Sequence, residues 1–107
     1  MGSSYERQIT LAIEPEDAGG RIREVLSAMP RVRQVREGPE AVTASARISW
    51  WSWGEKITVR LAKSPGGTEV VVRSQCKLPT QSLDWGKNER NVNQILQGMG
   101  AVSKTWA

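Results

Sequence analysis

The sequence of 107 residues contains no histidine and a single cysteine, Cys76. Without an imidazole, the chain cannot build a Ser-His-Asp triad or a zinc site with histidine ligands. A lone thiol cannot form a disulfide framework, and without a neighbouring histidine it has no evident base to activate it. We therefore expect no catalytic residue, no metal site and no cofactor, and we interpret Cys76 as a small buried side chain.

Long apolar runs are also missing. The longest strings are as short as the three valines at 70–72, whereas a helix that spans a bilayer needs about 20 apolar residues. The N-terminus lacks a basic segment followed by an apolar stretch, which is the pattern of a secretory signal. We therefore expect no transmembrane segment and a cytoplasmic location.

The composition is that of a folded domain. Hydrophobic residues make up 38% and charged residues 24%, and the 15 Lys and Arg against 11 Asp and Glu give a net charge of +4. These values are close to globular averages, and the length fits one domain over residues 1–107. We interpret Met1–Ser4 as disordered or as additions to the natural chain, and we assign no structure to the tail at 101–107.

Alternation of apolar and polar residues predicts five strands. Four of them cover residues 5–13, 42–50, 56–62 and 70–76. The segment 31–36 is ambiguous, because Val32 and Val35 do not share strand parity, and we interpret it as a short edge strand.

Apolar residues at helical spacing predict two helices. The first begins in the acidic segment 14–17, which suits a helix N-terminus, and ends at Pro30. The second begins with Asp84 as its N-cap. The apolar residues are Ile22, Val25, Leu26 and Met29 in the first helix and Trp85, Val92, Ile95, Leu96 and Met99 in the second.

Residues 64–67, Ser-Pro-Gly-Gly, predict a type II turn with a positive φ at Gly66. With this turn as the hinge, the apolar residues of both flanking strands fall on one face. The predicted pairs are Leu61 with Val70, Val59 with Val72, Ile57 with Ser74, and Glu55 with Cys76.

The predicted element order is β-α-β-β-β-β-α, an α+β fold. Four consecutive strands pair as a meander, and the helical crossover places the first strand beside the fifth. The expected sheet is antiparallel with the strand order 1-5-4-3-2, numbered along the chain. Because each strand has one apolar face, we expect both helices on the same side of the sheet.

Two segments carry a family resemblance: SWGEKITV at 52–59 and LPTQSLDWGKN at 78–88. They resemble the signature of a small prokaryotic family of unknown function, which implies no activity. The element order is similar to that of the TATA-binding-protein repeat and of the helix-grip START-type lipid carriers. The carriers hold ligands between the sheet and the C-terminal helix, and the TATA-binding protein uses the open sheet face. The chain lacks the extra strands and helix of the carriers, so the resemblance does not extend to a large lipid cavity.

The tryptophan cluster at 50–53 is the first candidate site. Trp50 and Trp53 have inward strand parity, and Trp51 is the member that we expect to meet solvent. They are interpreted either as plugs at the end of the core or as an aromatic rim for an apolar ligand. The preferred function is a non-enzymatic module that binds a small apolar or amphipathic molecule between the sheet and the C-terminal helix. Its candidate residues are Trp50, Trp51, Trp53, Glu55 and Trp85.

The outer sheet face is the second candidate site. Basic residues share the outward parity there: Arg47, Lys56, Arg60 and Arg73. Such a face could bind an anion or the phosphates of a nucleic acid, and this is the alternative function. A charged face is also the ordinary way to solvate a one-sided sheet.

Two further interpretations stay open. Glu55 and Asp84 would lie at one end of the core and could perform acid–base chemistry, or they could instead bind loop amides and cap the helix. An exposed Trp51 would suit a protein-interaction role. The ligand's identity and the oligomeric state are left open by the sequence.

Overall fold

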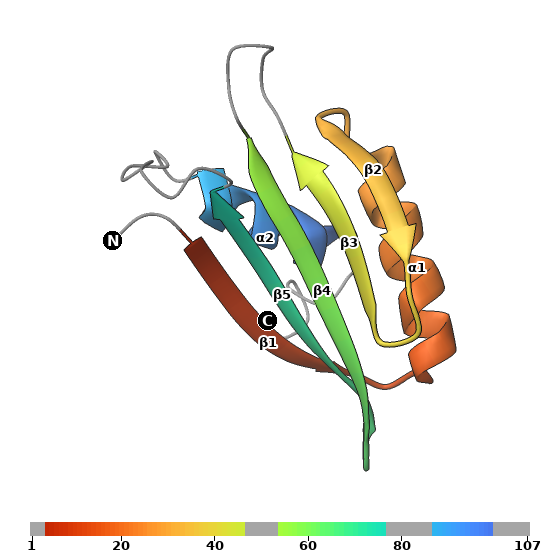
Figure 1. Ribbon diagram of the computed structural model, residues 1–107. Helices are drawn as coiled ribbons and strands as arrows, with labels where there is room; N and C mark the ends of the chain where they lie inside the picture. The colour runs from red at the N-terminus through yellow and green to blue at the C-terminus, as the bar shows by residue number, and fades with distance from the viewer. Residues whose placement is uncertain (1–3, 47–53, 77–86, 100–107) are drawn as a thin grey trace.

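The strands and helices form where the sequence alternates or repeats at helical spacing. The structure, a computed structural model, describes residues 4–46, 54–76 and 87–99. Its elements in chain order are β1 (Ser4–Leu11), α1 (Pro15–Ala28), β2 (Val32–Glu37), β3 (Ala41–Ala46), β4 (Glu55–Ser64), β5 (Gly67–Cys76) and α2 (Lys87–Gly98). The predicted element order is confirmed (Figure 1).

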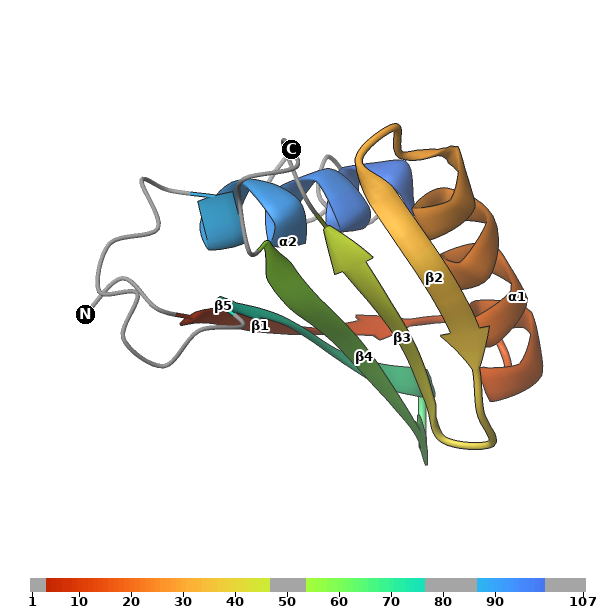
Figure 2. The ribbon, with the colours of Figure 1, turned by 45° about the horizontal axis from the view of Figure 1, so that its top comes forward.

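The strands form one antiparallel sheet in the order β1-β5-β4-β3-β2. Both helices lie on the same face of the sheet, with α1 against β2, β3 and β4 and α2 against β5 and β1 (Figure 2). The predicted α+β class, the strand order and the two helices on one face are therefore confirmed. None of the described residues covers the opposite face, which Figure 1 shows toward the viewer.

The β4–β5 hairpin has the predicted register. Leu61 pairs with Val70, and Glu55 pairs with Cys76 at the other end of the hairpin. The even-numbered residues of β5 are buried toward the helices, and its odd-numbered residues are more exposed. Because the side chains alternate in the pleat, this register determines which residues of both strands face the core.

The turn that closes this hairpin is not of type II. Ser64 pairs with Gly67, and the positive φ of 139° lies at Gly67 and not at Gly66. The prediction of a type II turn is therefore wrong. A Cβ at position 67 would also clash with the carbonyl oxygen of Leu11, so glycine is needed there for its φ and for the close approach of β1.

A β-bulge in β2 explains the ambiguous parity of this segment. The register with β3 shifts between Arg33 and Arg36, and Gln34 has a φ of 57°. The extra residue lets two valines with the wrong spacing for a regular strand reach the same core: Val32 is buried, and Val35 packs partly buried against it. The predicted edge strand is confirmed, and the bulge gives it its irregular pattern.

The core lies between the inner face of the sheet and the two helices. Ile22 and Leu26 of α1 are fully buried, and Val25 and Met29 pack partly buried against the core. The buried apolar residues of α2 are Val92, Ile95 and Leu96, followed by Met99 just beyond its end. The predicted apolar stripes are confirmed for these described residues.

Some predictions concern residues outside the described ranges. These are the end of the third strand at Trp50, the N-cap Asp84, the helical position of Trp85 and the tail at 101–107. Ser4, which was expected to belong to a disordered or added N-terminus, is the first residue of β1.

Gly98→Ala tests the close approach of the two helices. A Cβ at position 98 would lie 2.7 Å from Cγ1 of Val25, so we expect the free energy of unfolding to fall by about 1–2 kcal/mol through overpacking. Gly20→Ala is the matched control, because a Cβ there has no atom within 4 Å and should stabilise α1 by about 0.5–1 kcal/mol. Urea denaturation measures the free energy of unfolding of both variants. Equal changes in the two would contradict the close contact between Gly98 and Val25.

Gln34→Val tests the bulge. A β-branched residue is poorly tolerated at a positive φ, so we expect a loss of about 1–2 kcal/mol in thermal or urea unfolding, although valine favours strands. Gln34→Gly should be neutral or stabilising. A Val variant more stable than the Gly variant would rule out the bulge conformation.

Candidate functional site

A cleft opens between α2 and the start of β2. Its floor contains Val32 and Ala46, which pair across β2 and β3. Asn91 and Gln94 of α2 form the opposite wall. The cleft has a volume of about 310 Å³, and its described lining residues are Met29, Pro30, Arg31, Val32, Ala46, Asn91 and Gln94. A hollow thus exists in the region where a ligand was predicted from the sequence, between the sheet and the C-terminal helix.

A second hollow, the interhelix groove, lies between α1 and α2. Its volume is about 440 Å³, and its described lining residues are Glu24, Val25, Ala28, Met29, Pro30, Gln94 and Gly98. Met29, Pro30 and Gln94 line both the groove and the cleft. The two hollows are therefore neighbours that share one wall.

A buried polar cluster connects α2 to the centre of the sheet. The Asn91 side-chain nitrogen donates to Glu55 Oε1 and to Ser74 Oγ, both at 3.1 Å. Ser74 Oγ in turn donates to Asn88 Oδ1 at 2.7 Å, and the Asn88 amide lies 3.5 Å from the sulfur of Cys76. The five residues, two from α2 and three from β4 and β5, form the polar cluster.

Glu55 is the charged member of the polar cluster. Its side chain is inward, as predicted, and the residue is only 2% exposed. It pairs with Ala46 on one side and Cys76 on the other. One carboxylate oxygen, Oε1, accepts from Asn91, whereas Oε2 has no partner among the described residues. A buried carboxylate is costly without hydrogen-bond donors. Among the described residues, Asn91 is the group whose hydrogen bond lowers that cost.

Asn91 belongs to both the polar cluster and the cleft. It lines the cleft beside Gln94, and its amide nitrogen is held by Glu55 and Ser74. An amide fixed by two acceptors has a defined orientation, which is how binding sites hold polar contacts in place. Asn91 therefore gives the cleft a positioned hydrogen-bonding group.

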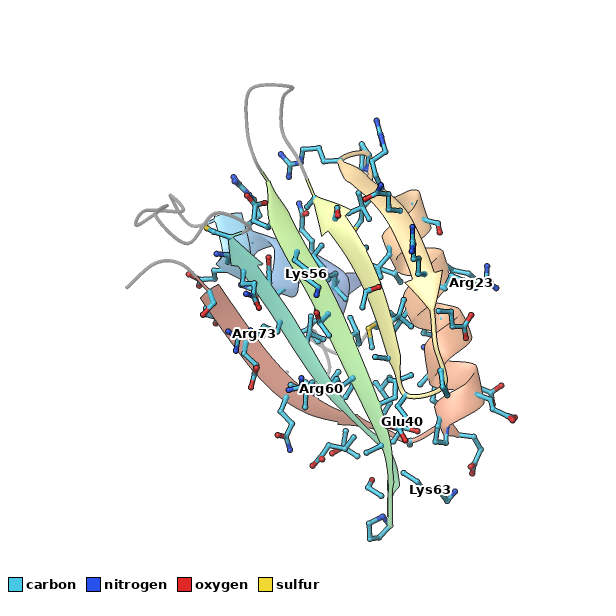
Figure 3. The ribbon with its side chains drawn as sticks, in the orientation of Figure 1. Arg23, Glu40, Lys56, Arg60, Lys63 and Arg73 are labelled. Carbon is cyan, nitrogen blue, oxygen red and sulfur yellow. The ribbon has the colours of Figure 1, made fainter. Side chains whose placement is uncertain are left out.

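The outer face of the sheet carries the predicted cations. Lys56 and Arg60 are exposed there and form no hydrogen bond or ion pair with a described residue. Arg73 lies 3.5 Å from Glu6 and also donates to Gln75 at 3.0 Å. Figure 3 shows Lys56, Arg60 and Arg73 spread over β4 and β5 on the side that faces the viewer.

Most of the other predicted site residues lie outside the described ranges. Of the ligand-binding candidates this applies to Trp50, Trp51, Trp53 and Trp85, and of the basic candidates to Arg47. Asp84, the predicted partner of Glu55 in acid–base chemistry, also lies outside them. Within 4–46, 54–76 and 87–99, no group of three or more His, Cys, Asp or Glu side chains could hold a metal ion.

The sequence prediction missed several polar residues that the fold brings together. Asn88 and Asn91 precede Val92, Ile95 and Met99 at helical spacing, so amides on an apolar stripe were the available signal. Arg33 and Arg36 were also missed as members of the outer face. Their parity depends on the bulge at Gln34, and the irregular spacing of Val32 and Val35 was the available signal for it.

A comparison with protein-family models matches residues 3–99 to the family described as "Protein of unknown function (DUF1499)". The match covers most of the chain, so the chain belongs to this family. A search of curated proteins found no significant match. Among the described residues, no helix is both long enough and apolar enough to cross a bilayer.

Asn91→Leu tests the polar cluster. The change removes the amide that donates to the buried Glu55, so we expect a loss of about 2–4 kcal/mol in urea denaturation. The double variant Glu55→Leu/Asn91→Leu should lose less free energy of unfolding than the sum of its single variants, because neither position 55 nor position 91 then holds a polar group without its partner. Gln97→Leu, exposed on the same helix, is the control. Additive losses would show that the two side chains are not coupled.

Proposed function

We propose that this member of the DUF1499 family is a non-enzymatic module that binds a small amphipathic molecule. The observation that carries the proposal is the shared wall of the two hollows, which joins an apolar groove to a cleft that contains one positioned amide, Asn91. The apolar body of the ligand would lie in the interhelix groove. Its polar end would lie in the cleft, between the sheet and α2.

The groove suits an apolar body. Val25, Ala28, Met29 and Pro30 present aliphatic surface, and each 100 Å² of apolar surface removed from water contributes about 2.5 kcal/mol. Small-molecule sites are commonly hollows of this kind, lined mostly by apolar groups with a few polar ones.

The cleft suits a polar end. Asn91 is held in place by Glu55 and Ser74, and Gln94 and Arg31 line the same hollow. Arg31 has no ion-pair partner among the described residues. Both N–H groups of Asn91 are donated within the polar cluster, so its side-chain oxygen is the group left to accept, whereas Gln94 and Arg31 can donate. The cleft therefore favours a polar end that carries both a donor and an acceptor.

Two other considerations support binding over catalysis. A general acid or base must reach the reacting group, and Glu55 is 2% exposed, with Asn91 on one of its oxygens. The resemblance of the element order to the helix-grip carriers also favours a ligand between sheet and C-terminal helix, although a shared fold does not by itself imply a function. The tryptophans at 50, 51 and 53 remain candidates for the rim of the site.

Ala28→Glu tests the proposal with Nile red, a neutral apolar dye, as the probe. A carboxylate in the apolar wall must lose water when the dye binds. We therefore expect the Kd of Nile red, measured by fluorescence titration, to rise about fivefold or more, which corresponds to roughly 1 kcal/mol. Ser27→Glu is the matched control, because Ser27 is the exposed neighbour on α1 and does not line the groove.

Native mass spectrometry of the purified protein provides a second readout, since a bound small molecule adds discrete mass. The proposal fails if Nile red does not bind, or if both glutamate variants weaken it equally. Circular dichroism confirms that each variant is folded.

A further inference from the structure

The outer face of the sheet carries an excess of positive charge, on residues that do not line the cleft. Its described charged residues are Arg33, Arg36, Lys56, Arg60 and Arg73 against Glu6 and Glu69. Arg33 and Arg36 belong to this face because they pair with Ser45 and Thr43. Residues directly opposite in an antiparallel pair share a face, and in β3 those two alternate with buried residues.

The cations lie in rows that cross the sheet. One row runs Arg36, Thr43, Thr58, Arg73 over β2, β3, β4 and β5. The next row along the strands runs Arg33, Ser45, Lys56, Gln75. With neighbouring strands about 4.8 Å apart, the ends of a row are about 14 Å apart, and adjacent rows are about 7 Å apart.

Hydroxyl side chains fill the space between the cations. Thr43, Ser45 and Thr58 occupy the middle of the two rows. Arginine, lysine, serine and threonine are the side chains that contact phosphate oxygens in nucleic-acid complexes. The centre of the outer face therefore presents donors for an anionic backbone between positive charges.

Most of this charge is not neutralised. Arg36, Lys56 and Arg60 form no ion pair with a described residue. Arg33 donates to the backbone carbonyls of Pro30 and Val32, which leaves its charge in place. Of the described cations on this face, only Arg73 has an acidic partner among the described residues, Glu6 at 3.5 Å. A surface of this kind attracts a polyanion.

We propose that the outer face binds the phosphate backbone of a nucleic-acid duplex without reading its sequence. Single-strand binding relies on aromatic side chains on which bases stack, and the strand residues described on this face include none. The apolar residues that the structure describes on this face, such as Val71 and Ala41, are too few and too small to insert into lipid. The proposal does not depend on the cleft.

The test uses the whole chain and a fluorescein-labelled duplex of mixed sequence, followed by anisotropy. We expect weak binding, with a Kd of about 10⁻⁴–10⁻⁶ M at physiological salt, and a linear fall of log K with log salt concentration. Three to five phosphate contacts predict a slope of about −3 to −4.5. Changing the duplex sequence should alter the affinity less than about twofold, since the face reads no base.

Arg36→Glu/Arg60→Glu should weaken binding at least tenfold at low salt and make the slope shallower by about two. Arg60→Glu alone should weaken binding at least about threefold. Its matched charge control is Arg90→Glu, because both variants change the net charge by the same amount and Arg90 is exposed on α2, which covers the opposite face of the sheet. It should weaken binding less than about threefold. Circular dichroism verifies folding, and Lys56→Gln gives a milder variant should the double variant unfold.

Three outcomes would overturn the proposal. Equal losses for Arg90→Glu and for Arg60→Glu, which change the net charge equally, would mean that net charge alone is responsible. Sedimentation with vesicles of phosphatidylcholine and phosphatidylglycerol, but no duplex binding, would identify a lipid surface instead. A dimer that dissociates in the Arg36→Glu/Arg60→Glu variant would identify the face as a contact between two copies.

Discussion

The pairing of β4 with β5 is the interaction on which the rest of this structure depends. These two strands are the longest in the sheet, and their register places Ile57, Val59, Val70 and Val72 toward the helices. A shift by one residue would place the apolar residues of one strand on the same face as the polar residues of the other. The same pairing therefore buries Glu55 beneath α2 and exposes Lys56 and Arg60, so that one hairpin defines an inner and an outer surface with different chemistry.

Much of the fold could be predicted because it depends on local periodicity. The alternation in residues 56–76 and the stripe from Val92 to Met99 determine the elements, and their one-sided apolar faces determine that both helices lie together. The turn was misjudged because Gly66 and Gly67 are both glycine, so the sequence does not show which one takes the positive φ. The close approach of Leu11 to Gly67, a contact distant in sequence, is also not visible in the local pattern.

The candidate site was only partly predictable, because it too depends on contacts between residues that are distant in sequence. The inward parity of Glu55 follows from strand alternation, but its partner Asn91 is 36 positions away on another element. Whether an amide on an apolar stripe faces a carboxylate depends on how α2 is rotated over the sheet. The hollows likewise depend on how closely the helices approach at Gly98 and Val25, which no periodicity describes.

The bulge in β2 has one more consequence, for the edge of the sheet. Among the described strands, β2 has one neighbour, β3, so its outer backbone groups are a potential template for strands from other molecules. A residue in the left-handed conformation at Gln34 interrupts that template, and the arginines on either side place like charges along it. The kink that brings Val32 and Val35 to the core thus also protects the chain against edge-to-edge aggregation.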